Sequence, residues 1–298
     1  MKIGLEEATE RLLASPGTVF VLGTMGTGKT RFAIDLLRRA HSQGIPAAFV
    51  DADIDQSTVG PPTAVGLKLS AGMEQVDENT LRTADALGFV GTLHPRQHLL
   101  PLVTATQKLV ARAREAGCRL IVVDTTGFVS GVYGQTLKYH KMDAVAPDFV
   151  VALERGGELE PLIGIAQRFT PAEVIELEAP PEEGTVSVED RISTREELFQ
   201  SYFSAGTSRW RVKPTVFMPT LPPEFALATL DGLVVGMEDG KGSCVGIGVL
   251  EYDESEDLLR MVSPVTQGVR GLRLGGVKIG IDGHAKGSVQ LSELFGTE

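Results

Sequence analysis

The chain has 298 residues, of which 42% are hydrophobic and 22% charged, and its formal net charge is −11. These proportions are ordinary for a globular protein, and the length suits one large domain or a large domain plus a small one. No apolar run approaches the roughly 18 residues that a membrane-spanning helix needs, so no membrane partner is expected. The negative charge argues against broad, non-specific coating of nucleic acid, although a local basic groove is compatible with it.

The redox state and location follow from small features of the sequence. The two cysteines, Cys118 and Cys244, lie far apart in the chain and are expected to be reduced thiols rather than a disulfide framework. The first residues lack the apolar run of a secretory signal and include acidic side chains, which argues against a transit peptide. We therefore expect the protein in the cytoplasm.

The first predicted elements surround a glycine-rich run, residues 23–30. A short helix over 5–14 precedes an apolar strand over 18–22, and helical spacing of apolar residues predicts a helix from about 29 to 41. The run GTMGTGKT matches the phosphate-binding pattern GxxxxGK[ST] in its strand–loop–helix context. The residues expected to bind ATP or another nucleoside triphosphate are Thr24, Met25, Gly26, Thr27, Gly28, Lys29 and Thr30. Among these, Lys29 would reach the phosphates and Thr30 would offer its hydroxyl to Mg²⁺.

Two carboxylates close the next predicted strand, which begins at about residue 46. Asp51 and Asp53 are two residues apart, so on a strand both would face the mouth where phosphate and metal bind. One of them could accept the proton of an attacking hydroxyl. The alternative is an acidic junction between strand and loop that only faces solvent.

A further predicted strand, 119–123, is preceded by a helix over 98–116 and ends at Asp124. A carboxylate at this place in a nucleotide-binding protein holds Mg²⁺ directly or through water. The residues that follow, Thr125, Thr126 and Gly127, could present hydrogen-bond donors to a second phosphate. Phe128 could stack on a base, and a place in the core is equally compatible with its sequence position.

The order of elements predicts the fold. Apolar strands over 149–153 and 173–177 continue a β-α-β rhythm, which indicates an α/β fold with a mostly parallel sheet flanked by helices. After about residue 210 the chain changes to short apolar runs separated by glycine, typical of a small antiparallel β domain. The expected division is a P-loop domain over 1–210 and a β-rich domain over 211–298.

Two basic segments are candidates for further roles. Arg191 and Arg195 are four residues apart, so on a helix within an expected lid, 185–205, both would face a triphosphate. The alternative is ordinary surface pairing with Glu196 or Glu197. The stretch 138–141, Lys-Tyr-His-Lys, mixes basic and aromatic residues as a nucleic-acid groove does, although a solvated helix face is the commoner explanation.

The sequence lacks the motif by which GTPases recognise guanine, which bears on which nucleotide is bound. A GTPase recognises guanine with Asn-Lys-x-Asp, and the sole asparagine, Asn79, lies in a different context. We therefore favour ATP as the nucleotide, or a kinase that does not discriminate between nucleotide bases.

Taken in order, the motifs GTMGTGKT, VDADIDQS, FVGTLHP and VDTTGFVSGVYGQTLKYHK, with the Arg-x-x-x-Arg lid, resemble the family of polynucleotide 5′-hydroxyl kinases. That family includes the kinase subunit of the cleavage-and-polyadenylation machinery and a nucleolar pre-rRNA kinase. The resemblance covers about residues 17–205. It differs at Asp55, where family members commonly have glycine, and at Phe128, where many have tryptophan.

The resemblance implies a role for each matching residue. Lys29 and Thr30 would bind phosphates and Mg²⁺, and Asp53 would act as general base with Gln56 nearby. Lys29 would be catalytic together with two arginines of the lid, Arg191 and Arg195, which would stabilise charge on the transferred phosphoryl group. The residues implied to contact the nucleic-acid end are Gln56, the clasp formed by Thr125, Thr126, Gly127 and Phe128, and, as the sequence position suggests, Lys138.

The expected activity is ATP- and Mg²⁺-dependent phosphorylation of the 5′-hydroxyl end of RNA or DNA. Two alternatives remain: a non-catalytic ATP-binding scaffold of an RNA-processing complex, and a kinase for a nucleoside or other small molecule. The sequence indicates no particular protein partner.

Overall fold

The computed structural model describes residues 3–181, 187–204 and 206–296. Parallel strands form its centre in the order β7-β6-β1-β5-β2, with β1 (Thr18–Gly23) between β5 (Leu120–Thr125) and β6 (Phe149–Glu154). The outer members of this group are β2 (Ala47–Ala52) and β7 (Glu173–Glu178). Because these five strands run in the same direction, the loops that follow β1, β2 and β5 open at one edge of the sheet.

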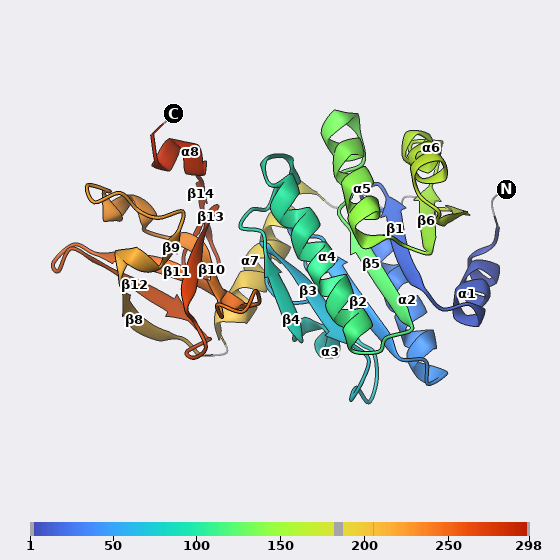
Figure 1. The fold of residues 1–298 in the computed structure, drawn as a ribbon, viewed down its shortest axis with the longest axis horizontal. Coiled ribbons are helices and arrows are strands. Elements are labelled where there is room, and N and C mark those ends of the chain that lie inside the picture. Colours follow the sequence, from blue (N-terminus) through green and yellow to red (C-terminus); the bar gives the residue numbers. More distant parts are fainter. Residues whose placement is uncertain (1–2, 182–186, 205, 297–298) are drawn as a thin grey trace.

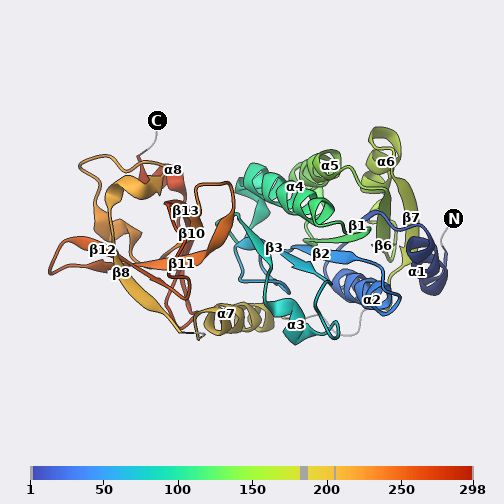
Figure 2. The ribbon, with the colours of Figure 1, turned by 60° about the horizontal axis from the view of Figure 1, so that its bottom comes forward.

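Helices cover both faces of the parallel strands, as Figure 2 shows. The helices α4 (Leu99–Glu115), α5 (Gly131–Val145) and α6 (Glu160–Phe169) pack on one face, and α1 (Leu5–Ala14) and α2 (Lys29–Ser42) pack on the other. Along β1, Phe20 and Leu22 join the first core, whereas Val19 and Val21 join the second. The continuous apolar run of this strand is thus explained by burial on both faces.

Two antiparallel strands extend the sheet beyond β2. β3 (Ala64–Leu69) pairs with β2, and β4 (Ala86–Phe89) pairs with β3, with the short α3 (Glu78–Arg82) between them in sequence. The expected α/β fold with a mostly parallel sheet is therefore confirmed. No strand was expected at β3, and the regions of α5 and α6 were expected only as helical or loop segments without defined bounds.

The C-terminal part is a unit of mostly antiparallel strands, and it lies at the opposite end of the molecule from the parallel strands (Figure 1). Its elements are β8 (Ser208–Val212), β9 (Phe217–Met218), β10 (Leu233–Glu238), β11 (Cys244–Asp253), β12 (Leu258–Ser263), β13 (Gly271–Ile279), β14 (Ala285–Ser288) and α8 (Leu291–Leu294). β8 crosses the expected boundary between residues 210 and 211 and pairs with β12. The unit joins the main sheet where Cys244 of β11 lies opposite Leu87 of β4.

A long helix, α7 (Val188–Ser204), connects the two parts. Its C-terminal half is anchored in the β unit, because Phe199 and Phe203 pack with Phe89 and Val234, and the backbone N–H of Ile247 donates to the Tyr202 hydroxyl over 3.0 Å. Its N-terminal half lies near the edge of the parallel strands. Among the described helices, none is both long and apolar enough to cross a membrane.

Candidate active site

The glycine-rich run forms a closed loop between β1 and α2. Gly26 and Gly28 adopt φ of 72° and 85°, a left-handed conformation that favours glycine, and Gly28 leads directly into α2. At Gly23, an added Cβ would lie 2.3 Å from the Thr27 hydroxyl oxygen, so this position also needs glycine. The backbone N–H groups at the start of α2 are oriented as in an anion-binding helix terminus.

Lys29 folds back over this loop. Its Nζ donates to the carbonyl oxygen of Thr24 over 2.7 Å, and only 7% of the residue is exposed. Burial lowers the pKa of Lys29, while the charges of Asp124 and Asp53 act in the opposite direction. The ammonium group thus belongs to the same electrostatic cluster as the two carboxylates.

Arg155, which the sequence analysis missed, holds the loop from the side. Its guanidinium donates to the carbonyl oxygen of Gly26 over 2.5 Å and to that of Pro180 over 2.9 Å. Arg155 follows directly after β6, the strand next to β1. The convergence of loops at the carboxyl ends of parallel strands was the available signal for it.

Thr30 and Asp124 meet beside the phosphate loop. The Thr30 hydroxyl donates to Asp124 Oδ2 over 2.5 Å. Burial raises the pKa of Asp124, and the hydrogen bond from Thr30 opposes that shift. The described residues contain no cluster of three or more His, Cys, Asp or Glu side chains able to hold a metal ion. One hydroxyl and one carboxylate nevertheless fit Mg²⁺, which keeps several waters and takes further oxygens from substrate phosphates.

The two carboxylates after β2 have different surroundings, so the expectation that both face the mouth is wrong for Asp51. That side chain is 1% exposed and accepts hydrogen bonds from the backbone N–H groups of Asp53, Thr58 and Val59. Burial, followed by the charges of Asp124 and Asp53, raises the pKa of Asp51 to about 8. Asp51 therefore shapes the loop over 53–59.

Asp53 instead lines the cavity beside the phosphate loop. This cavity, of about 510 Å³, also includes Lys29, Thr30 and Phe128. Asp53 Oδ1 accepts hydrogen bonds from the backbone N–H groups of Asp55 and Gln56, at 3.1 and 3.2 Å. The loop thus fixes the carboxylate while leaving it half-buried at the cavity wall.

The expected clasp, Thr125–Phe128, is only partly open to a ligand. The Thr125 side chain is fully buried and donates to the carbonyl oxygen of Val21 over 2.8 Å, which corrects the expectation that it contacts nucleic acid. Gly127 lies against the phosphate loop, since an added Cβ would come within 2.8 Å of the Met25 nitrogen. Phe128 packs against the core and also lines the cavity, and its stacking on a base stays a prediction.

Both lysines of the stretch 138–141 lie inside the protein. Lys138 and Lys141 are 0% exposed. The expectation that Lys138 contacts nucleic acid in a groove is therefore wrong, and so is the alternative that the two lysines lie on a solvated helix face. Lys138 Nζ donates to the Thr125 hydroxyl over 2.7 Å and to the carbonyl oxygen of Thr126 over 2.6 Å. Its role is to hold the clasp from behind.

Lys141 is a third buried lysine, and it was not among the site residues expected from the sequence. Burial lowers the pKa of Lys141 to about 7, although the charges of Asp53, Asp51 and Asp124 raise it. Its Nζ has no hydrogen-bond partner within the part of the chain that the structure describes. Three buried lysines and three aspartates therefore share one electrostatic cluster at the wall of the cavity and behind it, namely Lys29, Lys138, Lys141, Asp51, Asp53 and Asp124.

The expected lid residues lie on α7, opposite the phosphate loop. Arg191 donates to Asp55 Oδ2 over 2.6 Å and Arg195 donates to Asp55 Oδ1 over 2.9 Å. The Gln56 side-chain amide donates to the carbonyl oxygen of Arg191 over 3.1 Å. Surface pairing with Glu196 is therefore not what the arginines do, and Glu196 contacts His284 instead.

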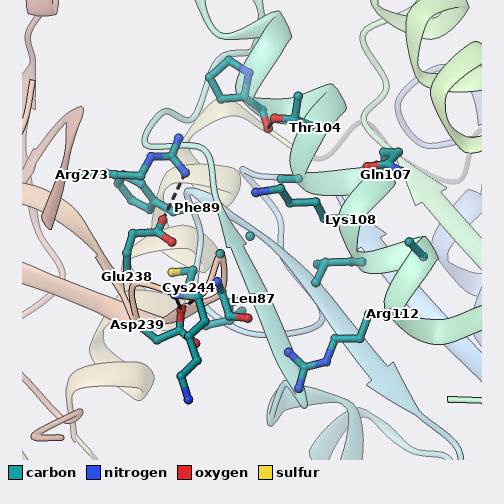
Figure 3. A pocket seen from close by; sticks show the side chains of 18 of the residues that line it. Leu87, Phe89, Thr104, Gln107, Lys108, Arg112, Glu238, Asp239, Cys244 and Arg273 are labelled. Carbon is teal, nitrogen blue, oxygen red and sulfur yellow. Dashed lines mark hydrogen bonds and ion pairs between the residues drawn. The ribbon is translucent and has the colours of Figure 1, made fainter. Parts of the chain in front are cut away.

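A larger cavity, of about 680 Å³, lies at the junction with the C-terminal unit (Figure 3). Lys108 and Arg112 of α4 line one wall, and Glu238 and Arg273 lie on the other. It contains none of the residues of the phosphate loop. The cavity beside the phosphate loop is instead the candidate active site, because it brings together the loop, the lid, and a hydroxyl and a carboxylate suited to Mg²⁺.

This fold and site define a P-loop nucleotide-binding protein. Residues 23–205 match the model of the family described as the mRNA cleavage and polyadenylation factor CLP1 P-loop, and the chain belongs to that family. It is 28% identical to a polyribonucleotide 5′-hydroxyl-kinase of Thermococcus kodakarensis, over 94% of this chain and 93% of the relative. A polyribonucleotide 5′-hydroxyl-kinase of Pyrococcus furiosus is 26% identical, over 95% and 94% of the two chains.

A solved structure supports the same fold. The wild-type Clp1p–Pcf11p complex contains a chain that superposes with a TM-score of 0.72, at 12% identity, over 92% of this chain and 78% of that one. The family model and the named relatives confirm the resemblance to the polynucleotide kinase family. The roles of individual site residues stay predictions.

Proposed function

We propose that this chain is a polyribonucleotide 5′-hydroxyl kinase that transfers the γ-phosphate of ATP to the 5′-OH end of RNA. The observation that carries the proposal is the shared cavity, in which Asp53 lies with Lys29 and Thr30, facing Arg191. Family membership and relatives named as polyribonucleotide kinases support RNA over DNA as the acceptor. The cytoplasmic location expected from the sequence stays a prediction.

In the proposed reaction the triphosphate lies along the loop over 23–30, where the α2 terminus and Lys29 stabilise its negative charge. Lys29 would exchange its bond with the Thr24 carbonyl oxygen for the phosphates. Thr30 and Asp124 would hold Mg²⁺, which supplies charge neutralisation to the phosphates when bound. The two lid arginines would add positive charge from the opposite side.

The acceptor hydroxyl would approach from the side of Asp53. The Asp53 carboxylate accepts its proton as the oxygen forms a bond to the γ-phosphorus and the bond to the ADP oxygen breaks. Phe128 and the backbone of Thr126 and Gly127 line the cavity where a terminal nucleotide would lie. Most of the rate enhancement would come from positioning and electrostatic stabilisation, as in other phosphoryl transfers.

A length series tests this proposal. The purified chain is mixed with γ-labelled ATP and Mg²⁺, and with 5′-hydroxyl RNA oligonucleotides of increasing length, a nucleoside and the matching DNA. We expect labelling that rises from nucleoside to oligonucleotide, and none on RNA that already carries a 5′-phosphate. Equal labelling of the free nucleoside would identify a small-molecule kinase, and ATP binding without any transfer would identify a non-catalytic scaffold.

A further inference from the structure

One carboxylate holds both lid arginines. Arg191 and Arg195 contact different oxygens of Asp55, at 2.6 and 2.9 Å. The side chains of Asp55 and Arg195 are 11% and 14% exposed and that of Arg191 is 30% exposed, so these charge-assisted contacts are partly shielded from solvent. An ion pair between exposed side chains contributes little to stability. Two partly shielded contacts to one carboxylate instead hold both guanidinium groups in place.

The same contact lies at the edge of the phosphate site. Asp55 and Arg191 both line the cavity that contains Lys29 and Thr30. Asp55 also follows Asp53 by two residues, and the Asp53 carboxylate accepts the backbone N–H of Asp55 over 3.1 Å. Asp55 therefore presents a negative charge to the lid from the loop that carries the proposed general base.

Arg191 has a donor to spare in this arrangement. Its Nε is buried and makes no hydrogen bond within the described residues, whereas its Nη2 is engaged by Asp55. A buried donor without a partner is costly, so an acceptor that reached both nitrogens would be favoured over the present one. A phosphate presents several oxygens and can accept from both nitrogens along one edge of a guanidinium group.

The position of α7 limits how the lid can respond. Phe199, Phe203 and Tyr202 fix its C-terminal half in the β unit, and Glu196 contacts both His284 and the backbone N–H of Ala285. Exchange of partners is thus confined to the end that carries Arg191 and Arg195. The side chains can exchange acceptors while the helix stays anchored.

We infer that Asp55 is a positioning residue that acts as a resident counter-ion: it occupies the lid arginines until the γ-phosphate of the nucleotide displaces it. The inference rests on the proposed function for the nucleotide, but not on the identity of the acceptor. Asp55 then opposes ATP binding and has no effect on nucleotides too short to reach the lid. Only a nucleotide long enough to place a phosphate at the lid can release the two arginines from it.

Nucleotide affinity tests this inference without turnover. The dissociation constants of ATP and AMP are measured by calorimetry for the full chain and for Asp55→Asn and Asp55→Ala. We expect ATP to bind about fivefold to tenfold more tightly to both variants, the effect of removing one partly shielded ion-pair competitor, and AMP to change less than twofold. In a variant that also carries Arg191→Ala and Arg195→Ala, the gain for ATP should disappear.

A matched control is Glu251→Gln, which removes a carboxylate that pairs with Arg209 at 2.9 Å in the C-terminal unit. It should leave the affinity for ATP unchanged. Unchanged or weaker ATP binding in the Asp55 variants, with folding verified by circular dichroism, would overturn the inference. Because binding is measured directly, the inference can hold even if RNA is not phosphorylated, and it can fail even if RNA is.

Discussion

The Thr30 hydroxyl lies 2.5 Å from Asp124 Oδ2, joining the first residues of α2 to the end of β5. These two residues are 94 positions apart in the chain and come together because β5 is the parallel neighbour of β1. A hydroxyl and a carboxylate placed together beside a phosphate loop are the groups that a kinase uses to hold Mg²⁺. The pairing of β1 with β5 thus explains why Asp124 and the phosphate loop belong to one site.

Removing the Thr30 hydroxyl should weaken the binding of Mg²⁺. Thr30→Val keeps the shape of the side chain but loses the oxygen, so we expect the transfer rate to fall about 10- to 100-fold and the Mg²⁺ requirement to rise. Thr30→Ser keeps the oxygen and should retain most of the activity. The measurement is the rate as a function of Mg²⁺ concentration. Identical Mg²⁺ curves for the wild type and Thr30→Val would remove Thr30 from the metal site.

The clasp lies so close to the phosphate loop that a methyl group at Gly127 should disturb ATP binding. Gly127→Ala would bring a Cβ within 2.8 Å of the backbone nitrogen of Met25, so one of the two loops must shift. We expect ATP affinity to fall about tenfold or more, because a displaced phosphate loop loses hydrogen bonds to the ligand. Gly4→Ala, where an added Cβ meets nothing within 4 Å, is the matched control. Equal affinity in both variants would contradict the close approach.

The buried lysine of α5 should make stability depend on pH. The pKa of Lys141 is lowered to about 7 in the folded state, below its value of 10.5 in an unfolded chain. Its contribution to stability is therefore fully present above pH 10.5 and is lost as pH falls through 7. Lys141→Met removes this titration. Its stability relative to the wild type should be greatest near pH 6 and decline toward pH 9, as measured by urea denaturation. A difference that is independent of pH would show that Lys141 does not titrate this way.

The anchor of the lid helix can be tested at Tyr202. Tyr202→Phe leaves the buried backbone N–H of Ile247 without its acceptor, at a cost of about 1–3 kcal/mol of unfolding free energy. Tyr252→Phe removes a hydroxyl that bonds Asp257 at an exposed site and should change stability by less than about 0.5 kcal/mol. Both variants are compared by chemical denaturation. Equal stabilities would mean that the Tyr202 hydroxyl does not hold α7.

Much of the parallel sheet could be predicted from the sequence because its strands are buried on both faces. The runs at 18–22 and 119–123 are continuous and apolar, and they coincide closely with β1 and β5. The helix α5 could not be predicted in the same way, since its buried face includes Lys138 and Lys141. Hydrophobic periodicity fails where a functional cluster places charges in the interior.

The site shows the same limit. The phosphate loop is local in sequence, so its pattern predicts Lys29 and Thr30 directly. The contacts of Asp55 with Arg191 and Arg195 span 136 and 140 residues, and no local spacing encodes them. The different environments of Asp51 and Asp53 depend on backbone N–H groups of the following loop, which a strand periodicity does not describe.

Asp53→Asn shows whether the Asp53 carboxylate takes the proton of the acceptor hydroxyl. Single-turnover transfer from labelled ATP to a 5′-hydroxyl RNA is measured together with ATP affinity, with Asp253→Asn as a surface control. We expect a transfer rate about 10²- to 10⁴-fold lower in Asp53→Asn, with the affinity for ATP nearly unchanged. Transfer at the wild-type rate in Asp53→Asn would contradict this role of the carboxylate.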